Sequence, residues 1–229
     1  MWVKICGTTN LEDAQMATEA GADALGFLFA ESRRRVTPAE VSAITPHLPA
    51  SVEKIGIFDD ADFEKIVATV NECGLTGVQL HSALNPGLSA RLREHFDAAS
   101  PRLRILGVIH YSPDLEARLS TAQEDPAIDG VLVDSRTATL LGGTGIRFDW
   151  QTASRSFLSA ASRLRVIAAG GLNPGNVAEA ISILRPWGVD VVTGVEASPG
   201  KKDPARVRSF ITNARIAAAK ANLDVAVEV

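Results

Sequence analysis

Short apolar runs alternate with segments of helical spacing along the whole chain. Most runs are continuously apolar rather than alternating, which is typical of parallel strands covered on both faces. Eight strand–helix units predict the α/β class and a single-domain (β/α)8 TIM barrel; the alternative, a doubly wound open sheet, more often has about five or six strands. The eight runs are Trp2–Cys6, Ala24–Phe29, Glu53–Phe58, Gly77–His81, Leu103–Ile109, Gly130–Asp134, Leu164–Ala169 and Val189–Gly194.

Residues that begin helices stand between several of these runs. Leu11–Ala20 has helical spacing, and Asn10 before it is a residue type that caps helix N-termini. Thr37-Pro38 and Asn173-Pro174 each place a capping residue before a proline, which predicts two further helix starts. The sixth helix is expected within Asp149–Ser162. These signals support a repeat of strands and helices.

The composition limits the classes of function open to the chain. Its 229 residues are 46% apolar, enough to bury a large core, and its formal net charge of −4 gives no electrostatic case for a nucleic-acid or membrane partner. Two cysteines do not make a disulfide framework, and the N-terminal segment lacks the pattern of a signal peptide. We expect a cytoplasmic protein with a barrel at 1–218 and a C-terminal tail at 219–229 beyond the last helix.

Polar residues gather where the predicted strands end. In barrel enzymes, the loops after the carboxyl ends of the strands form the active site. The shared location of these residues, rather than any one of them, predicts a catalytic site here. They are Cys6, Arg33–Arg35, Asp59, Asp60, His81, His110, Asp134, Gly170-Gly171 and Thr193-Gly194.

Cys6 ends the first run and precedes a glycine. A free cysteine is most often a small buried apolar residue; the alternative is a reactive thiolate, which needs a positive or hydrogen-bonding environment. Lys4 lies two residues back, so its side chain points to the same side of the strand. A buried ammonium needs an anionic partner, and Asp190 is the candidate. Cys73, on the apolar face of its helix, is expected to fill the core.

Further strand ends suggest an acid and two anion sites. Asp134 is either the cap of the next loop or a general acid that keeps its proton. Gly170-Gly171 and Thr193-Gly194 follow the seventh and eighth runs, where barrels frequently bind phosphate through backbone N–H groups. One arginine of Arg33–Arg35 is expected to bind a carboxylate, and the other two to be solvated. Gly142–Gly145 lacks the ending of a nucleotide-binding phosphate loop, and the histidines show no metal-ligand spacing.

Eight stretches of the chain carry a resemblance to a known family. They are VKICGTTNLEDA at 3–14, GADALGFLFA at 21–30, SRRRVTPAE at 32–40, GVQLH at 77–81, LVDS at 132–135, GGTGIRFDW at 142–150, AGGLNPGNVAEAI at 169–181 and GVEASPGKKD at 194–203. KICG at the start and PGKKD at the end are the most specific. Up to about Arg215, the chain resembles the phosphoribosylanthranilate isomerases of tryptophan biosynthesis.

The resemblance implies an Amadori rearrangement of a phosphoribosyl aminoaldose to an aminoketose, with no cofactor and no metal. The family's general base falls on Cys6, its general acid on Asp134 and its carboxylate-binding arginine on Arg34. We expect the partner to be a small-molecule substrate and the chain to be a monomer or a homodimer. The remaining expected substrate-binding residues, four of them for the phosphate, are Gln79, His81, Asp190, Gly170, Gly171, Thr193 and Gly194.

Some positions depart from the family pattern. Asp59 and Asp60 follow the third strand, and Ile146 stands where a lysine is common. Acidic residues at the mouth are unfavourable for an anionic substrate. Two alternatives therefore stand beside the isomerase: a paralogous barrel acting on another phosphorylated sugar or aminosugar, and a non-catalytic phosphosugar-binding barrel. Retention of Cys6 and Asp134 argues against the second alternative, because a binding protein needs neither a base nor an acid.

Overall fold

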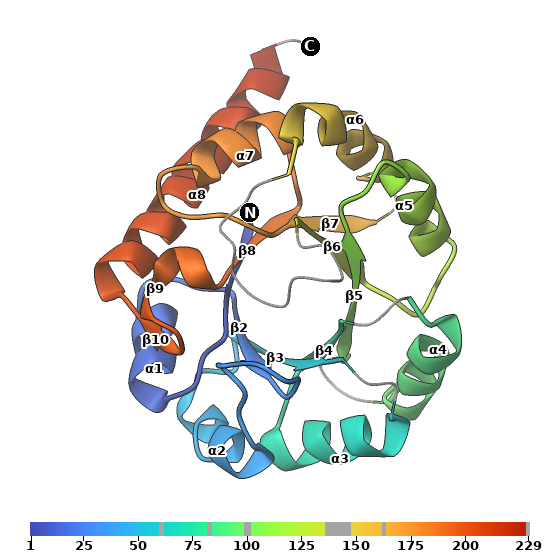
Figure 1. Ribbon diagram of the computed structural model, residues 1–229, viewed down its shortest axis with the longest axis vertical. Coiled ribbons are helices and arrows are strands. Elements are labelled where there is room, and N and C mark those ends of the chain that lie inside the picture. The colour runs from blue at the N-terminus through green and yellow to red at the C-terminus, as the bar shows by residue number, and fades with distance from the viewer. Residues whose placement is uncertain (60–61, 82–83, 99–101, 136–147, 162–163, 228–229) are drawn as a thin grey trace.

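The computed structural model describes residues 1–59, 62–81, 84–98, 102–135, 148–161 and 164–227, with side chains as far as residue 221. Within these ranges, eight parallel strands close into a barrel in sequence order, and β8 pairs with β1. Figure 1 shows this inner ring of strands surrounded by helices. The predicted barrel is confirmed. Its strands are β1 (Trp2–Cys6), β2 (Ala24–Leu28), β3 (Glu53–Phe58), β4 (Gly77–Leu80), β5 (Arg104–His110), β6 (Gly130–Asp134), β7 (Arg165–Ala168) and β8 (Gly188–Val191).

Helices follow the strands on the outside of the barrel. None of the described helices is long and apolar enough to cross a membrane. A hairpin of β9 (Glu196–Ser198) and β10 (Lys201–Lys202) follows the barrel, and η1 (Thr45–His47) and η2 (Thr193–Val195) are short 3₁₀ turns. The helices are α1 (Leu11–Glu19), α2 (Pro38–Ser42), α3 (Phe63–Cys73), α4 (Pro86–His95), α5 (Leu115–Gln123), α6 (Trp150–Ala160), α7 (Val177–Leu184) and α8 (Pro204–Val227).

Two of the three predicted helix starts are confirmed. The Asn10 side chain accepts a hydrogen bond at the start of α1, and Thr37 forms a capping box at the start of α2. The start predicted at Asn173-Pro174 is wrong, because α7 begins at Val177. Asn173 Oδ1 instead accepts from the N–H of Gly175 at 2.8 Å. This hydrogen bond two residues along the chain closes an Asx turn before the helix.

The last helix is longer than the hydrophobic pattern predicted. We expected residues 219–229 to form a tail, but α8 continues through Val227. The stretch contains no glycine or proline, and it begins with the good helix formers Ala219, Lys220 and Ala221. Because these residue types favour a helix and nothing in the stretch ends one, the helix continues past the point where its apolar periodicity stops.

The inner face of β1 passes through three different environments. Side chains alternate along a strand, so Trp2, Lys4 and Cys6 share that face. Trp2, at the N-terminal end of the strand, belongs to an apolar cluster inside the barrel. Lys4 is opposite Asp190 in the β1–β8 register, and Cys6 ends the strand at the opposite, C-terminal end. The thiol is thus placed at the mouth, above a layer of buried charge and a layer of apolar side chains.

Candidate active site

A cavity of about 570 Å³ opens at the carboxyl ends of the strands. It brings together residues from distant parts of the chain, as the positions of the strand ends predict. Glu196, which we did not predict, also lines the cavity. The predicted residues that line it are Cys6, Arg33, Arg34, Asp59, Gln79, His81, Asp134, Asp190 and Thr193.

Cys6 is buried in the cavity wall, with 4% of its surface exposed. It pairs with Gly26 on β2, and a Cβ at position 26 would lie 2.6 Å from the Cys6 Sγ, so only glycine leaves room for the sulfur there. Burial raises the pKa of the Cys6 thiol above its ordinary value, whereas the ammonium groups of Lys4 and Lys202 act against that rise. The site therefore holds a thiol beside two positive charges that favour its conversion to the thiolate.

Lys4 lies two residues before Cys6 on β1, on the same face of the strand. Its Nζ is fully buried and donates to Asp190 Oδ1 at 2.8 Å and to Gln79 Oε1 at 2.9 Å. The predicted pairing of Lys4 with Asp190 is confirmed. Burial lowers the pKa of Lys4, but the charges of Asp190 and Cys6 outweigh it and raise the pKa overall. Lys4 therefore stays positively charged, one layer deeper in the barrel than Cys6.

Asp134 ends β6 and is 3% exposed. The loop after β7 passes directly over it: a Cβ at Gly170 would lie 2.6 Å from Asp134 Oδ1 and 2.2 Å from Ser135 Oγ. The φ of Gly170 is +78°, a conformation that other residues rarely adopt. Glycine is required here both for its backbone conformation and for the close approach to the carboxyl group.

The two predicted phosphate loops pack against each other. Gly171 has a φ of +67°, and a Cβ at Gly194 would lie 2.0 Å from the carbonyl oxygen of Leu172. Thr193 lines the cavity, while Gly170, Gly171 and Gly194 lie beside it rather than among its described lining residues. The loops after β7 and β8 thus form one backbone surface at the edge of the cavity.

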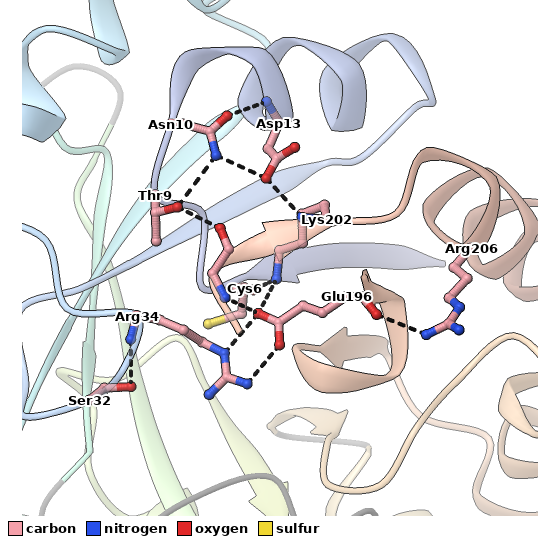
Figure 2. A network of polar contacts seen from close by, with 10 residues as sticks. Cys6, Thr9, Asn10, Asp13, Ser32, Arg34, Glu196, Lys202 and Arg206 are labelled. Atoms are coloured by element: carbon pink, nitrogen blue, oxygen red, sulfur yellow. Dashed lines mark hydrogen bonds and ion pairs between the residues drawn. The ribbon is translucent and has the colours of Figure 1, made fainter. Parts of the chain in front are cut away.

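Arg34 enters the cavity from the loop after β2, and its guanidinium is held by a carboxylate. Nε and Nη2 donate to the two oxygens of Glu196 at 2.7 and 2.6 Å (Figure 2). Arg33 and Arg35 are exposed, as predicted for two of the three arginines. The structure thus places one arginine of the run at the site.

The β9–β10 hairpin joins this ion pair to the first strand. The buried Lys202 Nζ donates to the carbonyl oxygen of Cys6 at 2.5 Å and lies 3.3 Å from Glu196 Oε1. The main-chain N–H of Lys202 donates to Asp13 Oδ2 at 2.8 Å, and Thr9 Oγ1 donates to the carbonyl of Gly200 at 2.6 Å (Figure 2). Residues near both ends of the chain therefore build one wall of the cavity.

His81, directly after β4, lines the cavity, and His110, at the end of β5, lies next to it. The rings of His81 and His110 meet edge to face with 5.8 Å between their centroids, and Gln79 Nε2 lies 3.4 Å from His81 Nδ1. Asp59 is exposed at the rim. Asp60, Ile146 and the Gly142–Gly145 stretch, which the sequence analysis singled out, lie outside the described residues.

The arrangement places a thiol, a buried carboxyl group, a partly buried arginine and two glycine loops around one cavity. The family model described as N-(5'phosphoribosyl)anthranilate (PRA) isomerase matches residues 3–213. The chain belongs to this isomerase family. An N-(5'-phosphoribosyl)anthranilate isomerase of Geobacter sp. (strain M21) is 42% identical over 93% of this chain and 97% of its own length. The resemblance seen in the motifs is confirmed.

Solved isomerases have the same fold. The phosphoribosyl anthranilate isomerase of Thermotoga maritima is 36% identical with a TM-score of 0.80, covering 94% of this chain and 98% of that one. Another solved phosphoribosyl anthranilate isomerase is in complex with reduced 1-(o-carboxyphenylamino)-1-deoxyribulose 5-phosphate. It is 35% identical with a TM-score of 0.77, over 94% of this chain and 98% of its own.

Among the residues that were not predicted as site residues, Gly26, Glu196 and Lys202 make the contacts that hold Cys6 and Arg34 in place. All three lie within the stretches GADALGFLFA and GVEASPGKKD that carry the family resemblance, so the signal was present in the motifs. Their contacts depend on the register of β1 with β2 and on how the β9–β10 hairpin folds against β1. Neither the register nor the hairpin can be deduced from spacing along the chain.

Proposed function

We propose that this chain converts N-(5'-phosphoribosyl)anthranilate to 1-(2-carboxyphenylamino)-1-deoxyribulose 5-phosphate, with Cys6 as general base and Asp134 as general acid. The observation that carries the proposal is that Cys6, at the end of β1, and Asp134, at the end of β6, line one cavity. The substrate and the product contain the same atoms. Proton transfers therefore suffice, and the step needs no oxidant or reductant.

Asp134 begins the reaction in this proposal. Its carboxyl group gives a proton to the ring oxygen of the ribofuranose as the bond between that oxygen and C1′ breaks. The nitrogen lone pair forms the C1′=N double bond of a Schiff base. Gly170 supports this role, because the backbone directly over the carboxyl group limits its access to water.

Cys6 then acts as the base. Its thiolate takes the proton from C2′, and the electrons of that C–H bond form a C1′=C2′ double bond while the C=N electrons return to nitrogen. The resulting enolamine loses the proton of its C2′ hydroxyl and gains one at C1′, which gives the ketone. The buried Lys4 ammonium, fixed by Asp190, supports this role because it favours the negative form of the thiol.

The remaining predicted residues bind the substrate in this proposal. Arg34 takes the carboxylate of the aromatic ring. The backbone N–H groups of Gly170, Gly171, Thr193 and Gly194 take the phosphate, supported by the close packing of their two loops. Gln79, His81 and Asp190 also line the cavity, and in this proposal they contact the sugar.

A second candidate is a related isomerisation of another phosphorylated aminosugar. The observation that favours it is the carboxylate of Asp59 at the rim of the cavity. Because Asp59 is exposed, water and salt screen its charge, so it repels an anionic substrate only weakly. A non-catalytic phosphosugar-binding barrel has no such supporting observation.

The test is turnover of phosphoribosylanthranilate generated in situ, followed by the loss of anthranilate-type fluorescence. We expect turnover by the purified chain without added metal or cofactor. A folded chain that binds phosphosugars but leaves this substrate unchanged would contradict the proposal and favour the second candidate. Turnover with a different amine in place of anthranilate would then identify the substrate.

A further inference from the structure

Glu196 is a buried carboxylate that contacts two cations, the buried Lys202 and the partly buried Arg34. It accepts from Arg34 through both oxygens, and its Oε1 also lies 3.3 Å from Lys202 Nζ and accepts from the N–H of Gly200 at 3.2 Å. The exposed fractions of the three side chains are 4% for Glu196, 11% for Arg34 and 0% for Lys202. Burial raises the pKa of Glu196, but the hydrogen bonds from Arg34 and the charge of Lys202 outweigh it and lower the pKa overall. Glu196 is therefore ionised.

The contact with Glu196 decides which part of Arg34 faces the cavity. A guanidinium carries five N–H donors in a fixed plane. Glu196 occupies the edge formed by Nε and Nη2. The edge between Nη1 and Nη2 is the remaining one that can hold a planar carboxylate through two parallel hydrogen bonds.

The stem of Arg34 is held as well as its head. A Cβ at Gly7 would lie 2.9 Å from Arg34 Cδ and 3.6 Å from Lys202 Nζ, so the stem passes directly over the turn after Cys6. Gly7 itself has a φ of +73°. The side chain is thus packed against the glycine turn at its middle and paired with Glu196 at its end, which leaves the guanidinium plane one orientation.

We propose that Glu196 is a positioning residue that orients Arg34, so that a single edge of the guanidinium receives the aryl carboxylate of the substrate. The inference rests on the proposed function, because it assigns the Arg34 subsite to that carboxylate. Glu196 itself does not touch the reacting atoms. It acts on substrate recognition, and its loss should raise KM more than it lowers kcat.

The first test is the Glu196→Gln variant in the turnover assay. The amide offers one acceptor oxygen instead of two and turns an N–H toward the guanidinium, so the orientation of Arg34 is lost. We expect KM to rise about tenfold or more, the worth of a hydrogen bond to a charged group, while kcat changes less than KM. A wild-type KM, or a fall in kcat with KM unchanged, would overturn the proposal.

Glu31 provides the matched control. It lines the same cavity, but its side chain is 89% exposed and lies 3.9 Å from Arg35. Glu31→Gln makes the same chemical change without a buried partner. We expect KM within about twofold of wild type, because exposed ion pairs contribute little.

A double-mutant cycle separates positioning from a purely structural role. If Glu196 acts through Arg34, Glu196→Gln adds no further rise in KM to an Arg34→Ala enzyme. Independent effects that simply multiply would contradict the proposal. Glu196→Asp keeps the charge and should recover part of the KM, and it replaces the Gln variant if that chain does not fold.

Binding of free anthranilate tests the Arg34 subsite without any need for turnover. In a fluorescence titration, Glu196→Gln and Arg34→Ala should each weaken binding by about tenfold. Unchanged affinity in Glu196→Gln would overturn the inference even if the wild type catalyses the reaction. Absence of turnover by the wild type would instead count against the proposed function, and the titration would still decide the role of Glu196.

Discussion

The interior of the barrel buries different kinds of side chain toward its two ends. The mouth holds charged groups of both signs: Lys4 with Asp190, and Arg34 and Lys202 with Glu196. Below these charges, an apolar cluster that includes Ile55, Leu106 and Ile167 fills the barrel, with Trp2 at its N-terminal end. Trp187 packs against Trp2 with 5.3 Å between ring centroids, and the guanidinium groups of Arg104 and Arg165 lie over it.

This contrast separates stability from chemistry. Buried ion pairs lose hydration and add little net stability, whereas apolar and aromatic burial is the main favourable contribution to folding. The charges at the mouth are therefore explained by what they do to Cys6 and Arg34. Substitutions at the mouth should change turnover, and substitutions at the opposite end should change unfolding.

The largest expected effect is on strand β6, which reaches both ends. Asp134→Asn removes the proposed acid at the mouth, and turnover should fall more than about 100-fold with the fold intact. Asp129 precedes the other end of β6 and binds Arg93 at 2.7 Å. Because it leaves the partly buried Arg93 without its charged partner, Asp129→Asn should lower the melting temperature, and it should leave kcat unchanged. Equal losses of turnover in both variants would contradict the division between the two ends.

The two cysteines allow a pH test of the same division. Burial, and then the charge of Glu72, raise the pKa of Cys73 to about 11. Burial also raises the pKa of Cys6. Because Cys6 lines the cavity, a small reagent can reach its sulfur. Only the thiolate reacts, so the rate at which iodoacetamide alkylates Cys6 should rise about tenfold per pH unit until the pH reaches the pKa of the thiol. We expect that pKa to lie above the ~8.5 of a free cysteine. Peptide mass spectrometry should show Cys73 reacting more slowly; a pKa for Cys6 below that value would be the contrary result.

Alanine substitutions at two glycines distinguish the effect of backbone strain from the effect of a contact with Asp134. Gly170→Ala places a Cβ against Asp134 and Ser135, and we expect kcat to fall about tenfold because the acid is displaced. Gly74 also has a positive φ, but a Cβ there meets nothing within 4 Å. Gly74→Ala should lower the free energy of unfolding by about 1 kcal/mol and leave the activity unchanged. Full activity in Gly170→Ala would show that the close approach to Asp134 is not needed.

The smallest effect on turnover should come from the N-terminal end. Trp187→Ala removes the ring between Arg104 and Arg165 and its contact with Trp2. Loss of this partly buried ring should lower the free energy of unfolding by about 2 kcal/mol. Denaturant unfolding and kcat measured on the same preparation make the comparison. A variant with wild-type stability and reduced kcat would reverse the roles assigned to the two ends.

Much of the fold follows from patterns that are local in sequence. Seven of the eight apolar runs agree with a barrel strand to within one residue at each end, because continuous apolar runs between turns favour buried parallel strands. The eighth, Val189–Gly194, ends three residues after β8, because the chain turns into η2 there. The Asn173 helix start failed because its side chain bonds the turn rather than capping α7. The extent of α8 was missed because helix propensity, not amphipathic spacing, continues it.

The site was predictable only in part. Cys6, Asp134 and the Lys4–Asp190 pair could be deduced from strand ends and from the side chains that share a face. Glu196 and Lys202 could not be deduced, because charged residues after a strand are normally exposed to solvent. They are buried because the short β9–β10 hairpin folds against β1 and the loop after it. That contact joins residues nearly 200 positions apart, so it is visible only in three dimensions.

The central claim is that the thiol at the mouth is the base, and one comparison tests it most directly. Cys6→Ala and Cys73→Ala each remove one buried thiol from the same chain. In the phosphoribosylanthranilate assay, Cys6→Ala should lose more than about 100-fold in kcat, the low end for acid–base catalysis, while Cys73→Ala keeps the wild-type rate. A Cys6→Ala enzyme that turns over near the wild-type rate would contradict the assignment of the base.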